Sequence, residues 1–175
     1  RISLQENGKI SDELSHTDVL TLLIQASDEE GRGLSDREIR DELATLIFAG
    51  FETTTNALAW TLCLLYEHQE VLQKGREEVQ SILQTKACSV EHLSQLKYIQ
   101  SILEESMRIY PPAHTVGRIT VSDIDIEGIS LKKGDIALVC PYLMHRISEV
   151  FPQPEVFRPE RFFYEEERSR IPKYT

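Results

Sequence analysis

The sequence predicts a mainly α-helical protein with a small β-sheet. Residues 1–110 combine helix-start signals with apolar side chains at helical spacing. Two consecutive prolines, Pro111 and Pro112, then end the helical region, because neither can donate a backbone hydrogen bond. Residues 111–175 contain short apolar runs separated by glycine turns, and then a segment rich in proline and aromatic residues. We therefore expect helices first, followed by a small sheet and a meander.

The first two expected helices lie before residue 66. Leu14–Ala26 places most of its apolar side chains on one helical face, and DEEGRG ends it with two glycines. Ser35, with Glu38 three residues later, forms a capping box at the start of the next helix. The apolar run from Ile39 to Leu65 contains no proline, which predicts one unusually long helix that is buried on most sides.

Three more helices are expected before Pro111. The first mixes apolar residues with charges, the second is short and begins at the N-cap serine Ser89, and the third ends at the two prolines. They cover His68–Leu83, the stretch from Ser89 to Leu96, and Lys97–Tyr110.

Four short strands are expected after the prolines, because apolar residues alternate or cluster around the turns Glu127-Gly128 and Lys133-Gly134. The segment from Pro141 to Phe163 is too punctuated for regular structure, but it holds enough apolar side chains to pack as an ordered loop. The strands are Arg118–Val121, Ile124–Ile126, Ile129–Leu131 and Asp135–Val139.

Composition restricts the class of protein. A chain of 175 residues with 41% apolar residues can bury one core. With 29 acidic and 19 basic residues, a net charge of −10 and no basic run, nucleic acid is not an expected partner. Cys63, Cys88 and Cys140 are far apart among apolar or helix-forming neighbours, which indicates reduced thiols in an intracellular compartment. The first residues show no secretory signal.

A membrane span is one alternative for the long apolar helix. The stretch Leu43–Tyr66 is long enough to cross a bilayer. However, the carboxylate of Glu52 at its centre would cost about 2.5–3.5 kcal/mol, and the polar residues that follow it, up to Asn56, add to this cost. We therefore expect no span in this segment, and a requirement for detergent would contradict that expectation.

The stretch AGFETTTN, residues 49–56, carries groups suited to proton transfer. Gly50 costs about 1 kcal/mol in a helix interior, which indicates that another group approaches the backbone there. Thr53 can bond to the carbonyl of Ala49 and open the helix locally. In such an opening, the carboxyl of Glu52 beside a hydroxyl can hold water and relay protons. The alternative is a buried helix in which glycine permits close packing and the threonines bond to their own backbone.

Three charged residues predict a fixed cluster. Glu105 and Arg108 are three residues apart on a helix, which alone indicates an ordinary surface ion pair. A second arginine, Arg161, follows in FRPERF. One carboxylate that faces two guanidinium groups is costly to bury, so such a cluster usually fixes a piece of architecture.

The order AGFETT, EESMR followed by PP, Arg118 and FRPERF resembles the cytochrome P-450 family of haem-thiolate monooxygenases. The resemblance covers nearly the whole chain. It implies that residues 1–175 are part of a single cytochrome P-450 domain, with helices I, J and K, short antiparallel strands and an ordered meander loop. It also implies that the N-terminal half and the cysteine-ligand loop of the family lie outside these residues.

The resemblance assigns the oxygen side of a haem site to the long helix. Ala49, Gly50, Thr53 and Thr54 would contact the cofactor, and Ala49 would also contact substrate. Thr53 would donate a hydrogen bond to the bound dioxygen. Glu52 would take part in the supply of protons.

Further roles follow from the same resemblance. Glu105, Arg108 and Arg161 match the family's structural triad. Arg118 matches an arginine that pairs with a haem propionate, and the alternative for it is a solvated charge at a strand end. His114 is equally a polar substrate contact or a bystander, and it is not expected to bind metal. The residues at the position of the substrate pocket are Ala113, His114, Thr115 and Val116.

No axial thiolate is expected in this chain. None of the three cysteines has the Phe-x-x-Gly-x-x-x-Cys surroundings that the family uses. The iron ligand is therefore expected beyond Thr175. We expect that the 175-residue chain alone neither binds haem stably nor turns over substrate.

For the complete protein, the resemblance implies haem b, activation of dioxygen and insertion of one oxygen atom into an apolar small molecule. Electrons would come from NAD(P)H through a reductase or a ferredoxin. The protein would be cytoplasmic if it is of the soluble bacterial type, or at the endoplasmic reticulum membrane if an N-terminal segment carries an anchor. A noncatalytic helical interaction module is the alternative class, because acidic, capped helices also fit such a protein.

Overall fold

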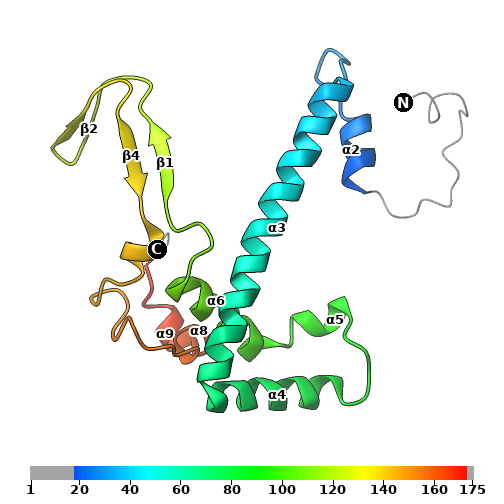
Figure 1. The fold of residues 1–175 in the computed structure, drawn as a ribbon, viewed down its shortest axis with the longest axis vertical. Coiled ribbons are helices and arrows are strands. Elements are labelled where there is room, and N and C mark those ends of the chain that lie inside the picture. Colours follow the sequence, from blue (N-terminus) through cyan, green and yellow to red (C-terminus); the bar gives the residue numbers. More distant parts are fainter. Residues whose placement is uncertain (1–17, 173–175) are drawn as a thin grey trace, which may run out of the picture. The chain divides into compact units, whose positions relative to one another are not determined.

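The computed structural model describes residues 18–172, with helices α2–α9 and strands β1–β4 (Figure 1). The predicted class, mainly helical with a small amount of antiparallel sheet, is confirmed. The chain forms two compact units, one that ends at Phe51 and one that begins at Glu52. Helix α3 (Asp36–Glu67) contributes residues to both.

In the first unit, a short helix precedes α3. Helix α2 (Val19–Gln25) begins at Asp18, whose carboxylate accepts the amide of Thr21 at 2.7 Å. The helix predicted over Leu14–Ala26 is therefore confirmed from residue 19 onward, while residues 14–17 of that prediction lie outside the described residues. A turn closed by a bridge between Ser27 and Gly33 then leads to α3.

The capping box at the start of α3 is confirmed. The amide of Ser35 donates to Oε2 of Glu38 at 2.7 Å, and the amide of Glu38 donates to Oγ of Ser35 at 3.3 Å. The first amides of a helix have no partner within the helix, so this exchange stabilises the helix start.

The prediction that α3 is buried on most sides is wrong for this chain. Ile47, Phe48 and Phe51 are 68%, 74% and 71% exposed. The helix is also continuous through Gly50, so the predicted local opening is not present. The apolar run predicted burial, but burial requires a packing partner, and the described residues provide one mainly for Ile39 and for the last turns from Thr61 onward.

The stretch Leu43–Tyr66 lies within α3. Among residues 18–172, no helix combines the length and the hydropathy that a bilayer span requires.

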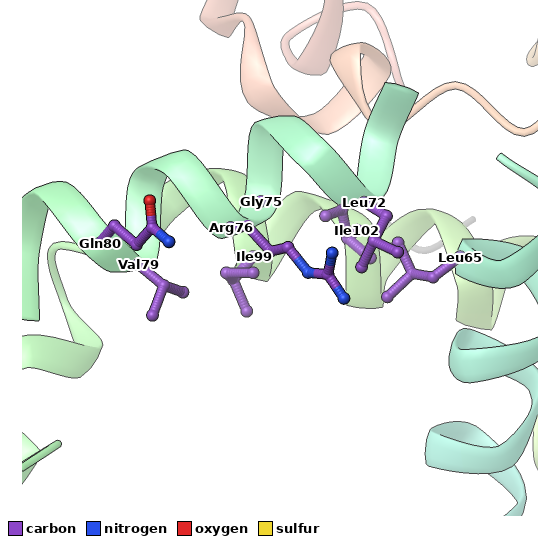
Figure 2. A pocket seen from close by; sticks show the side chains of 8 residues that line it. All are labelled: Leu65, Leu72, Gly75, Arg76, Val79, Gln80, Ile99 and Ile102. Carbon is purple, nitrogen blue, oxygen red and sulfur yellow. The ribbon is translucent and has the colours of Figure 1, made fainter. Parts of the chain in front are cut away.

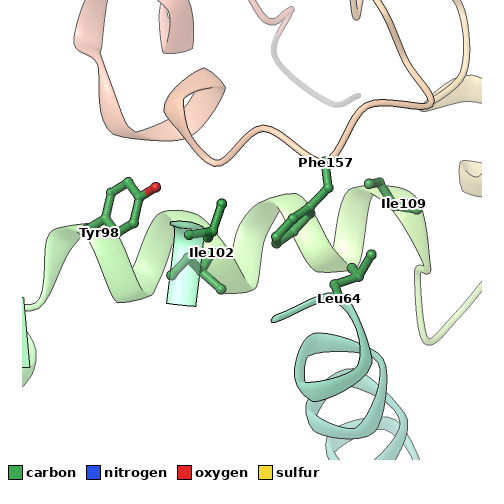
Figure 3. Packing of buried hydrophobic residues seen from close by; sticks show 6 residues of the cluster. Leu64, Tyr98, Ile102, Ile109 and Phe157 are labelled. Atoms are coloured by element: carbon green, nitrogen blue, oxygen red, sulfur yellow. The ribbon is translucent and has the colours of Figure 1, made fainter. Parts of the chain in front are cut away.

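The core of the second unit forms around α6 (Lys97–Ile109), against which α4 (Gln69–Leu83) and the end of α3 pack. Tyr98, Ile102 and Ile109 lie on one face of α6 and are buried (Figure 3). Leu64 of α3 and Phe157 of a later loop pack against the same face. Each large apolar side chain that is fully buried contributes about 1.5–3 kcal/mol, so this cluster secures α6 in the unit.

The three helices predicted for this unit are confirmed, although the second ends at Leu93 and not at Leu96. Helix α5 (Val90–Leu93) begins at Ser89 with a capping box, in which the Ser89 amide donates to Nδ1 of His92 at 3.0 Å. Helix α6 ends one residue before the predicted end, with Tyr110 as its C-cap ahead of the two prolines. The ring of Tyr110 stacks on that of Trp60, with centroids 4.1 Å apart.

The four strands form two antiparallel pairs. Strand β1 (Val116–Ile119) pairs with β4 (Ile136–Val139), and β2 (Ile124–Ile126) pairs with β3 (Ile129–Leu131). Strand β1 begins two residues earlier than predicted because Val116 and Gly117 pair with the end of β4. Gly128 and Gly134 occupy the predicted turns with φ of +86° and +93°, a conformation that glycine adopts without steric cost.

The last part of the described chain contains three single-turn helices, α7 (Pro141–Met144), α8 (Glu160–Phe163) and α9 (Glu165–Arg168). The prediction that 141–163 lacks regular structure is therefore wrong at both ends of that segment. At α7, proline presets the backbone angle of a first helical turn, and its carbonyl accepts the amide of His145 at 2.8 Å. The middle of the segment is an ordered loop, as predicted.

Candidate functional site

A fully buried carboxylate, that of Glu105 on α6, binds two arginines. Arg108, one turn later on the same helix, donates from Nε to Oε2 at 2.8 Å and from Nη2 to Oε1 at 3.0 Å. Arg161 of α8 donates from Nε to Oε1 at 3.2 Å. The structure therefore brings together the three residues of the expected cluster, although Glu105 and Arg161 are 56 residues apart in the sequence.

The same carboxylate also accepts the backbone amide of Arg158 at 2.9 Å. This donor is not predictable from the sequence, because a backbone amide leaves no signal in the residue pattern. Glu105 thus accepts four hydrogen bonds from the described residues, which replace the water that a buried carboxylate loses.

The two guanidinium groups also donate four hydrogen bonds to backbone carbonyls in the segment between α7 and α8. Arg108 donates to two of these carbonyls and Arg161 to the other two. The cluster therefore holds a proline-rich loop that has few backbone hydrogen bonds of its own. In order of sequence, the carbonyls belong to His145, Pro152, Gln153 and Val156.

The cluster places one negative and two positive charges in a dry environment. The side-chain exposures of Glu105, Arg108 and Arg161 are 0%, 1% and 3%. Burial lowers the pKa of Arg161 from its ordinary value, and the Glu105 carboxylate opposes this effect. The guanidinium of Arg108 also lies 5.3 Å from the centroid of the Phe151 ring. Each guanidinium nitrogen of Arg108 and Arg161 donates to at least one protein acceptor, so the cluster is suited to fixing structure.

The residues expected on the oxygen side of the site lie along one stretch of α3. Ala49, Gly50, Glu52, Thr53 and Thr54 are all exposed in the described structure. A Cβ atom added to Gly50 would meet no atom within 4 Å. Close packing within the described chain is therefore not the reason for glycine at this position. This excludes, for the described chain, the alternative in which the glycine of AGFETTTN permits close packing.

The segment expected to line the substrate pocket, Ala113–Val116, connects α6 to β1 and is exposed. Nδ1 of His114 lies 2.9 Å from Oγ1 of Thr115. The thiol of Cys140, at the end of β4, donates to the carbonyl of His114 at 3.2 Å. This contact, which the sequence pattern does not predict, ties the segment to the strand beside it.

Arg118 lies on β1 and is exposed. Its Nη1 atom donates to the carbonyl of Gly117 at 2.8 Å. No carboxylate of the described residues forms an ion pair with it. Its guanidinium is therefore available to an external carboxylate.

Comparison with known proteins gives the family of this chain. The family model of cytochrome P450 matches residues 2–175. The chain belongs to the cytochrome P450 family. Among curated P450 proteins, it is 37% identical over 155 residues to cytochrome P450 4V2 of Mus musculus, a match that covers 87% of this chain and 30% of that protein.

Bacterial P450 proteins match as well. The chain is 36% identical over 148 residues to the cyclooctat-9-en-7-ol 5-monooxygenase of Streptomyces melanosporofaciens, with 84% of this chain and 32% of that protein covered. The structure of a cyanobacterial P450, CYP120A1 with bound retinoic acid, matches with a TM-score of 0.86 and 28% identity. That match covers 99% of this chain and 39% of the other. The chain thus spans about a third of the length of the curated relatives it matches.

P450 proteins carry haem, and one feature of the described residues fits that group. The exposed guanidinium of Arg118 has the planar, charged donors that suit a propionate carboxylate, and no protein carboxylate of the described chain already occupies them. Among residues 18–172, there is no group of three or more His, Cys, Asp or Glu side chains that could hold a metal ion.

Proposed function

We propose that the complete protein is a haem-dependent monooxygenase that transfers one atom of dioxygen to an apolar organic substrate. Electrons from NAD(P)H would reach it through a reductase or a ferredoxin. Membership of the P450 family supports this reaction class. The observation that carries the proposal is the buried cluster of Glu105, Arg108 and Arg161, because residues from two separate sequence motifs meet there and one carboxylate binds both guanidinium groups.

In this proposal, the second unit binds and orients. Arg118 holds a haem propionate through its guanidinium, and Ala113–Val116 line the pocket for the substrate. The Glu105 cluster fixes the loop before α8 and touches neither substrate nor dioxygen. When bound, the haem supplies the centre at which dioxygen is reduced.

The stretch of α3 from Ala49 to Thr54 handles protons. The hydroxyl of Thr53 donates a hydrogen bond on the oxygen side of the haem, and the carboxylate of Glu52 renews the proton from solvent. Ala49, Gly50 and Thr54 contact the cofactor from the same helix, and Ala49 also contacts substrate.

The reaction class is tested on the complete reading frame that contains this chain. The purified protein, reduced and exposed to carbon monoxide, is expected to give the spectrum of a thiolate-ligated haem. Incubated with NAD(P)H, an electron-transfer partner and isotopically labelled dioxygen, it is expected to place one labelled atom in an apolar substrate. A carbon monoxide spectrum without thiolate character contradicts the proposal.

The role of Thr53 is tested by replacing it with alanine in the complete protein. The Thr53→Ala variant lacks the hydroxyl that is proposed to direct protons to the dioxygen-binding side of the haem site. It is therefore expected to release more peroxide per NAD(P)H consumed. Thr45→Ala is the matched control, because that hydroxyl, on the same helix, donates to the carbonyl of Asp41 at 2.9 Å. Equal coupling in the two variants would remove the assigned role.

We also infer that the 175-residue chain alone does not hold haem stably. Cys63 and Cys88 are exposed and Cys140 is half-buried, and none has the sequence surroundings of the family's ligand. Titration of the isolated chain with haem is expected to give no thiolate-type spectrum. A stable complex of that type would show that one of these cysteines serves as ligand.

A further inference from the structure

Helix α6, which carries Glu105 and Arg108, begins without a side-chain cap of its own. Its N-cap residue is Leu96, and its first turn contains no acidic residue. The first amides of any helix have no partner within the helix, and a buried amide without a partner is destabilising. The amides at the start of α6 therefore depend on another element.

Glu78 of α4 supplies the missing acceptor. Its Oε1 atom accepts the amide of Tyr98 at 2.8 Å, and its Oε2 atom accepts the amide of Ile99 at 2.9 Å. The carboxylate is half-buried between the two helices. Each bond is charge-assisted, and the negative charge lies at the positive end of the α6 dipole.

The packing of α4 on α6 brings Glu78 within reach. Gly75 lies one turn before Glu78 on α4 and is buried. A Cβ atom at Gly75 would lie 3.2 Å from the Cδ1 atoms of both Ile99 and Ile102. Figure 2 shows Gly75 with these two residues beside the groove between the helices. The glycine allows the close approach that a carboxylate with two methylene groups needs.

The other end of α6 is also held from outside. Pro111 and Pro112 prevent the helix from continuing, so its last carbonyls need external donors. Nδ1 of His145 lies 3.0 Å from the carbonyl of Arg108, and Nη1 of Arg146 donates to the carbonyl of Ile109 at 3.0 Å. A cationic side chain at this end again complements the helix dipole.

We propose that Glu78 is a positioning residue that sets the axial position of α6, with His145 and Arg146 holding the opposite end. The proposal rests on the proposed function, because it holds that this position places the Glu105–Arg108 pair correctly for the haem site. Glu105 is seven residues beyond Tyr98, about 10 Å along the helix. Its bonds of 2.8–3.2 Å would be lost by an axial shift of about 1 Å.

The test compares Glu78→Gln with Glu77→Gln in the complete protein. Both substitutions remove one negative charge from α4, but Glu77 is exposed and accepts from Gln73 on its own helix. In Glu78→Gln, the amides of Tyr98 and Ile99 are expected to exchange hydrogen at least about tenfold faster, because a charge-assisted bond is lost. The fraction of reduced protein with a thiolate-type carbon monoxide spectrum is expected to fall in the same variant and not in Glu77→Gln.

A rescue variant distinguishes a positioning role of Glu78 from a general loss of stability. The exposed Lys97 at the first position of α6 is changed to glutamate in the Glu78→Gln background, which returns negative charge to the helix start. Partial recovery of the thiolate fraction supports the proposal. Faster amide exchange with an unchanged spectrum in Glu78→Gln overturns the proposal, because Glu78 would then be a helix cap only. Unchanged amide exchange in Glu78→Gln also overturns it.

Failure of the proposed function gives a different result. If the unmodified protein has no thiolate spectrum, both the proposed function and the positioning role are refuted. Amide exchange then still shows whether Glu78 caps α6.

Discussion

Replacing Glu105 by glutamine should be among the most destabilising conservative changes in this chain. Oε1 accepts three of the four hydrogen bonds and Oε2 accepts one. If the amide oxygen of glutamine takes the place of Oε1, its NH₂ group faces the Nε donor of Arg108, formerly bonded at 2.8 Å. Even this best orientation loses one charge-assisted bond, worth about 1.5–3 kcal/mol. It also leaves two buried guanidinium groups without a counter-charge, for a total loss of about 3–5 kcal/mol.

The assay is chemical denaturation of the complete protein, followed by far-UV circular dichroism and by haem absorbance. Glu104→Gln is the matched control, because its partner Arg168 donates at 2.9 and 3.0 Å across a partly exposed pair. That control should cost about 0–1 kcal/mol. Glu105→Gln should therefore unfold at a clearly lower denaturant concentration and lose its haem earlier. If Glu105→Gln and Glu104→Gln lower the free energy of unfolding by amounts that agree within about 1 kcal/mol, the argument from buried charge is refuted.

Two further predictions concern single residues of the second unit. Gln84, the C-cap of α4, has φ of +51°, a conformation that glycine adopts more readily than glutamine. Gln84→Gly should therefore raise the free energy of unfolding by about 1 kcal/mol. Gln80→Gly, inside the helix, should lower it by about 1 kcal/mol in the same denaturation assay. Burial lowers the pKa of His145, with smaller contributions from the charges of Arg108 and Arg146, so the unfolded chain binds this proton more readily than the folded one. The stability that neutral His145 contributes should be complete above a pH of about 6.5 and be lost as the pH falls towards the lowered folded-state pKa. His145→Asn, which keeps a donor for the Arg108 carbonyl, should flatten the dependence of unfolding free energy on pH in that window, and an unchanged slope would contradict this assignment.

Local chemistry predicted much of the fold. Ser35 with Glu38, the paired prolines after Tyr110 and the glycine turn at Gly128 each have a short-range physical effect, and the structure has a helix start, a helix end and a hairpin turn there. The errors arise where an element depends on distant packing. Apolar residues in α3 predicted burial, but Phe48 is exposed because no described residue covers it.

In the candidate site too, some features were predictable from the sequence and others depend on packing. The three charged residues of the cluster were predictable through the family resemblance, because each is a side chain within one of the motifs that carry it. The Arg158 amide and the loop carbonyls were not, because every residue except proline carries a backbone amide and every residue carries a carbonyl. Glu78 was also missed, because a glutamate on an amphipathic helix has the pattern of a solvated side chain. Its role depends on how closely Gly75 lets the helices approach.

The buried face of α6 combines two kinds of interaction that restrict the helix differently. Tyr98, Ile102 and Ile109 gain free energy from burial, which changes little if the helix slides by a fraction of a residue. The bonds of Glu105 are short and directional, so the same slide breaks them and leaves buried charges without partners. Apolar packing therefore supplies most of the stability of α6, and the charge cluster selects one position from the many that such packing permits. This division explains why a costly ionic group lies among the buried apolar side chains of α6.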